Sequence, residues 1–340
     1  MANRKITIRD VAALVGVHHS TVSRALNPKT KDRISPEMVR KVDKAAEKLG
    51  YFPNIAAATL KQNRSFALGV LIPDLMNPVF PPIIRGIQDT AEAKGYTVFI
   101  ANTDDDEKKE QDALNIMSGR SIDGLIIATA WRNDAIVDKC IERELPFVLV
   151  NRTVDREGVN AVIVDEEFGI RATLDHLISL GHKRIAHIAG PQHSSTGYER
   201  AKAFEDYLTL KNMESGLVEH MEKFTVEEGH RAIKRLLARD NQFTAVVAAS
   251  DLTALGCIDA MQELGLLCPE NISVIGNNDI IFLARMNPAL TTVSIPKYDM
   301  GAQAARILLG LVNGEPRDPV ILRMQPRLMI RNSTSRAGAF

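Results

Sequence analysis

The chain of 340 residues has few cysteines and no long apolar run. Its three cysteines, Cys140, Cys257 and Cys268, are odd in number, far apart and without Cys-x-x-Cys spacing, which argues against disulfides and structural zinc. No apolar stretch approaches the length of a membrane span, and the first residues lack the apolar segment of a secretory signal. We therefore expect a cytoplasmic protein with buried thiols and no membrane partner.

The motifs of common catalytic chemistry are also missing. There is no phosphate-binding loop, no Gly-x-Gly-x-x-Gly after a strand, no His-Glu-x-x-His and no Gly-x-Ser-x-Gly. His182, His187 and His193 are close in sequence, but GHKRIAHIAG is typical of a loop followed by a buried strand, so we interpret them as structural histidines rather than metal ligands. We expect no enzyme activity, no cofactor and no metal site.

The net charge is zero, yet the charges are unevenly distributed. Residues 1–64 hold 13 Lys and Arg against 5 Asp and Glu, whereas the remaining residues hold 29 against 37. Because neutralisation of phosphates supplies most non-specific affinity for nucleic acid, the basic N-terminal part is expected to face DNA and the acidic remainder to be repelled from it. The alternative is that the basic residues form an ordinary solvated face.

The basic part contains two short helical patterns separated by a tight turn, in residues 7–27. Thr7 and Asp10 have the spacing of a capping box, so a first helix is expected to begin there. Gly16 can adopt the left-handed backbone that ends this helix, and a second helix is expected at about residues 20–26. The apolar residues expected to pack the pair together are Val11, Ala12, Leu14, Val15, Val17, Val22, Ala25 and Leu26.

The second helix is expected to direct hydrogen-bonding side chains outward. Arg24 can form two bonds with guanine, and His19 and Ser20 near the helix start can reach base edges in a major groove. Thr21 and Ser23 suit phosphate contacts. The alternative is an ordinary helical hairpin with a solvated polar face. The candidate DNA-binding residues of this stretch are Thr7, His18, His19, Ser20, Thr21, Ser23, Arg24 and Asn27.

A third helix and a longer set of motifs accompany this pair. Ser35, Pro36 and Glu37 provide a cap, a first-turn proline and an acidic residue suited to a helix start, and Gly50 is suited to its end. The runs IRDVAALVGV, TVSRALN and ISPEMVRKVDKAAEKLGYFPNIAAATLK resemble the N-terminal part of the LacI/GalR family of bacterial transcriptional regulators. The resemblance continues through most of the chain. It departs at His18, where the family usually has serine, although an imidazole can still donate to a phosphate.

Residues 53–61 can form a further short helix that begins at Pro53 and Asn54. At fewer than ten residues it is below the length at which an isolated helix persists in water, so it is expected to fray when free. The resemblance implies that this is the hinge helix, which pairs with its twin across a dimer axis, and that Leu60 enters the minor groove as a wedge that kinks the duplex. The alternative is that Leu60 anchors a linker. The further candidate DNA-binding residues are Asn54, Leu60 and Lys61.

From residue 66 onward, short apolar runs alternate with helical segments. This alternation predicts successive strand–helix units and hence doubly wound sheets, and the runs are numerous enough for two sheets. The runs expected to be buried strands cover residues 68–72, 97–101, 124–128, 147–150, 162–164, 185–188, 245–248 and 272–275, and the helices between them include residues 82–94, 168–180, 201–211, 226–238 and 252–264.

The resemblance implies the architecture of periplasmic sugar-binding proteins, with two similar lobes between which the chain passes near Val164, Ser294 and Met324. The expected fold is an N-terminal all-α helix-turn-helix domain with a hinge helix, followed by an α/β periplasmic-binding-protein-like core of two doubly wound lobes. The expected boundaries are residues 1–52 for the DNA-binding domain, 53–64 for the hinge helix and linker, and 65–335 for the ligand-binding and dimerisation core, with lobe one at about 65–164 and 294–324 and lobe two at about 165–293 and 325–335.

Polar and aromatic groups follow the apolar runs, at the strand ends where such folds bind ligands. Each has a structural alternative, since Asn and Asp after a strand often cap a helix and a single Trp is more often core or rim. The resemblance favours Arg200, because TGYER is similar to the segment with the family's effector-binding arginine, and Asn278, because GNND is similar to its Gly-x-Asp-Asp turn. The candidate effector-binding residues are Asn77, Phe80, Trp131, Arg152, Asp165, Thr196, Arg200, Ser250 and Asn278.

These groups suit a polar small metabolite. Amides, carboxylates and guanidinium groups can bind several hydroxyls or a carboxylate at once, and an aromatic face can cover an apolar ring. Asn278 is a neutral amide where the family has an acid, and Arg132, Arg152 and Arg200 are expected nearby. The expected effector is therefore a sugar, with a sugar acid or sugar phosphate as alternatives.

The combined pattern predicts a ligand-responsive, sequence-specific transcriptional regulator. We expect a repressor of carbohydrate or related small-metabolite genes that binds a near-palindromic, double-stranded DNA operator as a homodimer. One alternative is a solute-binding receptor without regulatory activity, which the larger domain alone would support but which the basic N-terminal part and missing export signal disfavour. Another is an enzyme of the metabolite's pathway, which the absent motifs disfavour.

Overall fold

The computed structural model describes residues 6–26, 30–51, 64–214, 217–316 and 318–338. The chain divides into two compact units, Met1–Ser65 and Phe66–Phe340. Four predicted DNA-binding residues, Asn27, Asn54, Leu60 and Lys61, lie outside the described residues, as does the segment predicted to form the hinge helix.

In the described part of the first unit, three helices pack around a small apolar core. Val11, Val22 and Val42 come one from each helix and are fully buried. A core of this size is expected to be only marginally stable in isolation. The elements are α1 (Ile8–Val15), α2 (His19–Ala25), the 3-10 turn η1 (Lys31–Arg33) and α3 (Pro36–Leu49).

The turn between α1 and α2 has the form expected from the sequence. The Asp10 carboxylate accepts hydrogen bonds from the backbone N–H and the hydroxyl of Thr7, at 2.8 and 2.7 Å. Gly16 then ends α1 in the left-handed region at φ 75°. The prediction that Leu14 packs the two helices together was wrong, since this residue is 48% exposed. It lies to the side of the helix face on which Val11 and Ala12 are buried.

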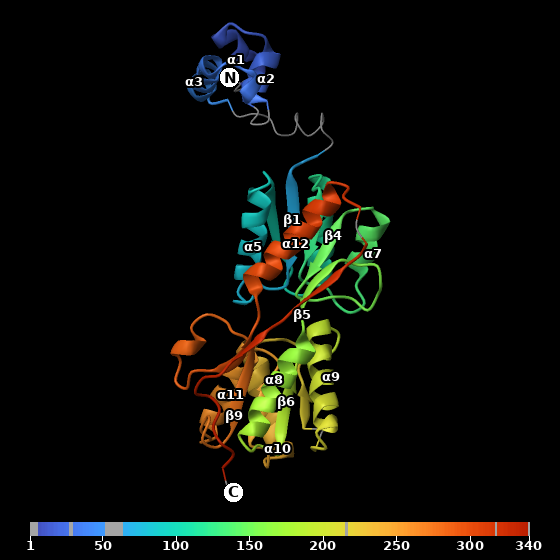
Figure 1. Cartoon of the computed structure of the whole chain (residues 1–340), viewed down its shortest axis with the longest axis vertical. Coiled ribbons are helices and arrows are strands. Elements are labelled where there is room, and N and C mark those ends of the chain that lie inside the picture. The colour runs from blue at the N-terminus through green and yellow to red at the C-terminus, as the bar shows by residue number, and fades with distance from the viewer. Residues whose placement is uncertain (1–5, 27–29, 52–63, 215–216, 317, 339–340) are drawn as a thin grey trace. The chain divides into compact units, whose positions relative to one another are not determined.

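The second unit contains two six-stranded sheets, one in each lobe (Figure 1). In lobe one the sheet order is β11-β5-β4-β3-β1-β2, and all paired strands are parallel. The lobe-one elements are β1 (Ala67–Ile72), α5 (Phe80–Glu92), β2 (Thr97–Asn102), α6 (Glu107–Gly119), β3 (Gly124–Ile127), α7 (Ala135–Glu142), β4 (Phe147–Val150), β5 (Ala161–Val164), α12 (Lys297–Val312) and β11 (Ile321–Met324).

Lobe two repeats this plan, with the sheet order β12-β10-β9-β8-β6-β7. Its strands are parallel except that β12 runs antiparallel to β10, with Val293 opposite Leu328. The lobe-two elements are α8 (Glu166–Ser179), β6 (Ile185–Ala189), α9 (Ser195–Leu210), β7 (Val218–His220), α10 (Val226–Arg239), β8 (Ala245–Ala248), α11 (Asp251–Glu263), β9 (Ser273–Asn278), the 3-10 turn η2 (Leu283–Arg285), β10 (Thr291–Ser294) and β12 (Arg327–Met329).

Both faces of each sheet are covered by helices, which explains the apolar runs of the sequence. In lobe one, alternate residues such as Val70 and Ile126 pack under α5 and α12, while Leu71 and Ile127 pack under α6 and α7. A strand buried on both sides needs apolar residues at successive positions rather than at every second one. The chain passes between the lobes after β5, after β10 and after β11. The predicted fold class of two doubly wound lobes is therefore confirmed.

Several details of the predicted strands were wrong. Strand β2 lies at the edge of its sheet and is largely exposed rather than buried, with Phe99 and Ile100 each 40% exposed. Strand β9 extends as far as Asn278, which was expected to follow the strand. Strands β7, β10, β11 and β12 were not among the predicted runs, because each is short and contains polar residues rather than a continuous apolar run.

Candidate functional site

The start of α2 is capped by a histidine. His18 Nδ1 accepts a hydrogen bond from Ser20 N–H at 3.3 Å and lies 2.8 Å from the Ser20 hydroxyl. The helix therefore begins at His19, one residue earlier than expected. An imidazole nitrogen can replace the usual hydroxyl because capping requires only an acceptor close to the first free N–H groups.

The outward face of α2 carries the predicted polar side chains. His19, Ser23 and Arg24 are exposed, while Ser20 and Thr21 are partly buried. The rings of His18 and His19 lie 4.0 Å apart, so the two imidazoles form one patch at the helix start. A helix with this face can supply donors and acceptors to the edges of bases. Thr7, by contrast, bonds Asp10 at the start of α1.

The second candidate site is a small pocket between the two lobes. Seven of the nine predicted effector residues line it: Asn77, Phe80, Arg152, Thr196, Arg200, Ser250 and Asn278. Its volume is about 30 Å³. Since small-molecule sites usually measure several hundred Å³, a ligand of that size requires movement of the lobes or of these side chains.

These seven residues meet because the carboxyl ends of the strands in both lobes face the pocket. Phe80 begins α5, and Arg152 follows β4. From lobe two, Thr196 and Arg200 lie in the first turns of α9, which begins at Ser195 rather than at residue 201 as predicted. Ser250 caps α11 through Thr253 N–H at 3.2 Å. The pocket is also lined by Asn151, Val79 and Phe224.

Val79 and Phe224 were missed for different reasons. Val79 directly precedes Phe80, and an apolar residue at a helix start is indistinguishable from core in the sequence. Phe224 follows β7, a strand of three residues that the sequence did not predict, so no ligand-binding residue was expected after it. Asn151, with φ 69°, is the polar neighbour of Arg152 and follows β4 directly.

Asp165 and Trp131 do not line the pocket. The Asp165 carboxylate accepts a hydrogen bond from Phe168 N–H at 3.0 Å and caps α8, which is the structural alternative considered for it. Trp131 packs edge-on against His193 at 4.2 Å between ring centroids. The guanidinium of Arg152 lies over its indole ring at 4.5 Å. Trp131 thus contacts the pocket residue Arg152 without lining the pocket itself.

Both pocket arginines are buried and paired with carboxylates. Arg200 is 2% exposed, and its Nε and Nη2 each lie 2.7 Å from an oxygen of Glu166. Arg152 is 4% exposed, donates to the carbonyl of Thr129 at 3.1 Å and forms an ion pair with Asp105 at 3.0 Å. The two guanidinium charges are therefore already balanced within the protein.

Beside the pocket, lobe one and lobe two are joined by direct contacts. Arg132 pairs with Asp155 at 2.6 Å, and its guanidinium lies 3.7 Å from the ring centre of Tyr198. The Arg132 N–H also donates to the carbonyl of His193 at 2.9 Å. Thr153 N–H donates to the hydroxyl of Ser195 at 2.9 Å. These contacts hold the two lobes together beside the pocket.

The histidines of lobe two are held by the core. His182 bonds Thr244 and the carbonyl of Ser335, and His187 Nδ1 lies 2.7 Å from the carbonyl of Val247. Burial lowers the pKa of His187 to about 4. Among the residues that the structure describes, no three His, Cys, Asp or Glu side chains gather as metal ligands. Likewise, no described helix is both long and apolar enough to cross a membrane.

Comparison with known proteins places these two sites in one family. Residues 7–54 match the bacterial regulatory proteins of the lacI family, and residues 174–334 match the periplasmic binding protein-like domain. The chain is 33% identical over 335 residues to the HTH-type transcriptional regulator RegA of Clostridium saccharobutylicum, covering 96% of this chain and 99% of the relative. The chain belongs to the lacI family of bacterial regulatory proteins, and it is a transcriptional regulator.

Two solved structures are similar over almost the whole chain. One is the lac repressor dimer bound to operator and the anti-inducer ONPF, with a TM-score of 0.86, 27% identity and coverage of 98% of this chain and 100% of that one. The other is a complex of the transcriptional regulator CelR with cellobiose, with a TM-score of 0.75, 30% identity and coverage of 97% and 100%. The named relatives are regulators rather than enzymes.

Proposed function

We propose that the protein is a cytoplasmic, homodimeric repressor whose affinity for a near-palindromic operator is set by a small neutral polyhydroxyl compound. The observation that carries the proposal is that one chain holds both a polar-faced α2 and a pocket between two lobes. A receptor without regulatory activity would have no use for the first. The domains we assign are 1–52 for DNA, 53–64 for the hinge and 65–335 for ligand and dimer contacts.

The DNA-binding role rests on the exposed face of α2. Arg24, His19 and Ser20 are proposed to contact base edges, and Thr21 and Ser23 to contact phosphates, because hydrogen-bonding groups of these kinds suit those partners. The His18 ring is occupied as the helix cap through Nδ1, which leaves Nε2 for a phosphate. Thr7, Asn27, Asn54, Leu60 and Lys61 complete the proposed DNA contacts.

The dimer proposal is supported by an exposed apolar groove on lobe one, formed by β2 and α6. Phe99 and Ile100 on the edge strand and Ile116 and Met117 on α6 line this lobe-one groove, whose volume is about 420 Å³. Ile116 is 60% exposed. An apolar edge strand left in water favours aggregation, so a second copy of this chain is the occupant we propose.

The effector class follows from charge balance in the pocket. Glu166 and Asp105 already pair with Arg200 and Arg152, so an anionic ligand would have to compete with these carboxylates, of which Glu166 is buried and Asp105 is 30% exposed. A neutral polyol can instead bond the amides of Asn77 and Asn278, while Phe80 covers its apolar face. The similar CelR–cellobiose complex also contains a neutral sugar. A sugar acid or sugar phosphate is therefore not our preferred effector.

Because the pocket, at about 30 Å³, is much smaller than the usual small-molecule site, we expect binding of a sugar to change the lobe arrangement or the pocket side chains. A ligand can alter operator affinity only by binding two such arrangements differently. This link between pocket and DNA is the physical basis of the proposed regulation.

The test is selection of genomic DNA fragments by the full-length protein near physiological salt, with and without a pool of ribose, glucose, cellobiose, gluconate and glucose 6-phosphate. We expect an enriched palindrome whose recovery changes with the pool. No enrichment in either arm would contradict the repressor proposal. Thermal unfolding with each compound then assigns the class, because a ligand that binds the folded state raises Tm. A rise only with gluconate or glucose 6-phosphate would contradict the neutral-effector proposal.

A further inference from the structure

The backbone that presents Asn278 to the pocket is held in an unusual conformation. Asn278 has φ 113° and Asp279 has φ 52°, both in the left-handed range that favours glycine. Residues other than glycine remain in such conformations only where the surrounding structure holds them there. Asn278 is the last residue of β9, and the segment of residues 278–283 that begins there is called the loop below. The contacts of this loop therefore decide how the Asn278 amide faces a ligand.

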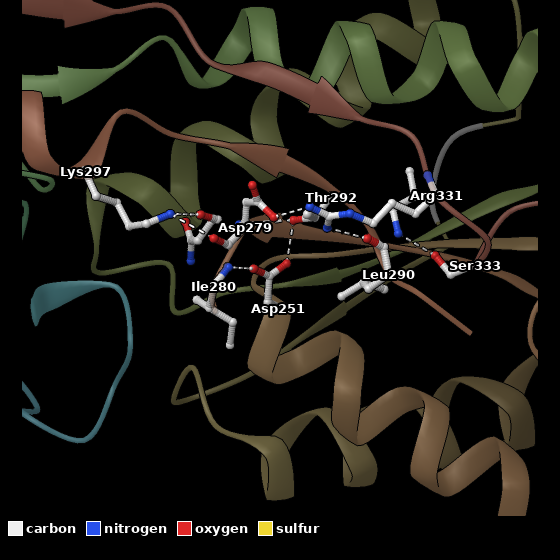
Figure 2. A network of polar contacts seen from close by, with 10 residues as sticks. Asp251, Asp279, Ile280, Leu290, Thr292, Lys297, Arg331 and Ser333 are labelled. Carbon is white, nitrogen blue, oxygen red and sulfur yellow. Dashed lines mark hydrogen bonds and ion pairs between the residues drawn. The ribbon is translucent and has the colours of Figure 1, made fainter. Parts of the chain in front are cut away.

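Lobe two holds the loop from one side through a buried polar network (Figure 2). Asp251 accepts hydrogen bonds from Ile280 N–H at 2.8 Å and from the Thr292 hydroxyl at 2.5 Å. Arg331 pairs with the Asp279 carboxylate at 2.6 Å. These contacts fix the residues after Asn278, but they do not reach its own carbonyl group.

The carbonyl of Asn278 is bonded by a lysine that belongs to lobe one. Lys297, the first residue of α12, donates through its amine to the carbonyl oxygens of Asn278 and, at 3.0 Å, of Asp279 (Figure 2). Burial lowers the pKa of this amine, whereas the carboxylates of Asp279 and Asp251 act in the opposite direction. Lys297 is partly buried, and its amine lies against the two carbonyl groups that it bonds.

The backbone of Lys297 belongs to α12, which packs tightly on α5, the helix that carries the pocket residue Phe80. Helices α12 and α5 lie side by side on lobe one (Figure 1) and approach so closely that a Cβ on Gly301 would meet the carbonyl of Ile83 at 1.9 Å. Tyr298 also donates to Asp89 at 3.1 Å. Because Phe80 begins α5 and lines the pocket, Lys297 joins the Asn278 wall to the Phe80 wall.

We infer that Lys297 is a positioning residue of the effector site, which holds Asn278 against lobe one and transmits occupancy of the pocket to α12. The claim that ligand binding in the pocket is transmitted to α12 rests on the proposed function. The claim that the Lys297 amine fixes the loop does not depend on that function. A lysine that acted only by packing its aliphatic chain would not need its terminal nitrogen.

The first experiment is hydrogen–deuterium exchange of the full-length, ligand-free protein, comparing wild type with Lys297→Met, Lys297→Arg and Lys202→Met. Methionine keeps the apolar stem and removes the amine, and arginine restores a cationic donor. Lys202 is an exposed lysine of α9 that pairs with Asp206 and serves as the matched control. We expect roughly tenfold faster exchange in peptides spanning residues 277–283 for Lys297→Met alone, because one hydrogen-bonding group of a closed loop is lost.

The second experiment measures operator affinity of the same variants with and without ribose, glucose and cellobiose. For a sugar that changes wild-type affinity, Lys297→Met is expected to reduce that change at least about fivefold, while Lys202→Met keeps the wild-type response. Unchanged exchange in residues 277–283, or full ligand response in Lys297→Met, would overturn the inference. If the wild type binds no operator at all, the proposed function fails, and the exchange result still decides whether Lys297 positions the loop.

Discussion

At the scale of single residues, both arginines that line the pocket between the lobes are paired, whereas α2 leaves His19, Ser23 and Arg24 exposed. Arg200 is bound by Glu166 through two bonds and cannot easily turn toward an anion. Arg24 is exposed on α2. The first arrangement suits a site that must recognise a neutral molecule, and the second suits a surface that acquires its partners only on binding DNA.

Arg24→Ala is expected to weaken operator binding by about 10- to 100-fold, since a two-bond contact from arginine to guanine contributes about 1–3 kcal/mol. Fluorescence anisotropy with the selected operator and with single-base variants measures the effect. Arg171→Ala, which removes an exposed arginine of α8, is the control and should bind normally. Equal loss of affinity for all DNA sequences would show that Arg24 contacts phosphate rather than a base.

His187 is expected to make the protein less stable as the pH falls. Burial lowers its pKa from an ordinary value of 6.5 to about 4, so between these values the unfolded chain binds a proton that the folded protein does not. The free energy of unfolding should therefore decrease from about pH 6.5 to about pH 4. Urea unfolding across this range measures the slope.

The matched variant for this pH dependence is His187→Gln, whose side chain does not titrate. Burial raises the pKa of Glu110 to about 7 and of Asp251 to about 6, and these carboxyls act with the opposite sign, stabilising the fold as the pH falls. Only the difference between wild type and His187→Gln isolates the histidine. A constant difference from pH 7 to pH 4 would contradict the prediction.

At the scale of elements, the close packing of α5 on α12 is what connects the pocket to the lobe-one framework. Glycines at the contact allow two backbones to touch: a Cβ on Gly86 would meet the carbonyl of Tyr298 at 2.1 Å. Such a contact is stiff because its partner is backbone rather than a movable side chain. Stiffness is needed if Lys297 is to move together with α5.

Gly86→Ala is expected to lower the free energy of unfolding by about 3 kcal/mol or more, because overpacking against backbone forces the helices apart. Thermal and urea unfolding measure this loss. Gly119→Ala is the control: it ends α6, and a Cβ there would meet nothing within 4 Å, so stability should stay the same or rise slightly. If the Gly86→Ala protein were as stable as wild type, the contact between α5 and α12 would not be tight enough for the two helices to move as one unit.

At the scale of the whole molecule, the proposed dimerisation and DNA binding each need a second copy of the chain. The lobe-one groove exposes apolar side chains of β2 and α6. One three-helix unit presents a single reading helix, whereas a palindromic operator requires two. Loss of the dimer should therefore weaken DNA binding without any change in α2 itself.

Ile116→Asp is expected to convert the dimer to a monomer, because it places a charge in the apolar groove, and to weaken operator binding by about 100-fold or more. Sedimentation velocity measures the mass, and anisotropy the affinity. Leu210→Asp is the control, since Leu210 is similarly exposed, at 66%, but lies on α9 of lobe two. A dimeric Ile116→Asp protein would show that the interface lies elsewhere.

The elements most reliably predicted were those with local signals. The bond between Thr7 and Asp10, the left-handed Gly16 and the Ser35 cap each depend on residues within four positions, so the three-helix unit could be read directly. Apolar runs likewise predicted most strands. The same reasoning led to seven of the nine predicted effector residues lying at one pocket, because the carboxyl ends of parallel strands lie on one side of a sheet.

The sequence by itself therefore determined the helix-turn-helix, the two doubly wound lobes and the strand ends that meet between them. Only the tertiary structure decided that Glu166 balances Arg200, that β2 is an exposed edge, and that Lys297 holds Asn278. The physical reason is separation along the chain. Capping and periodicity act between near neighbours, whereas charge pairing, edge position and contacts between lobes depend on residues that meet only after folding.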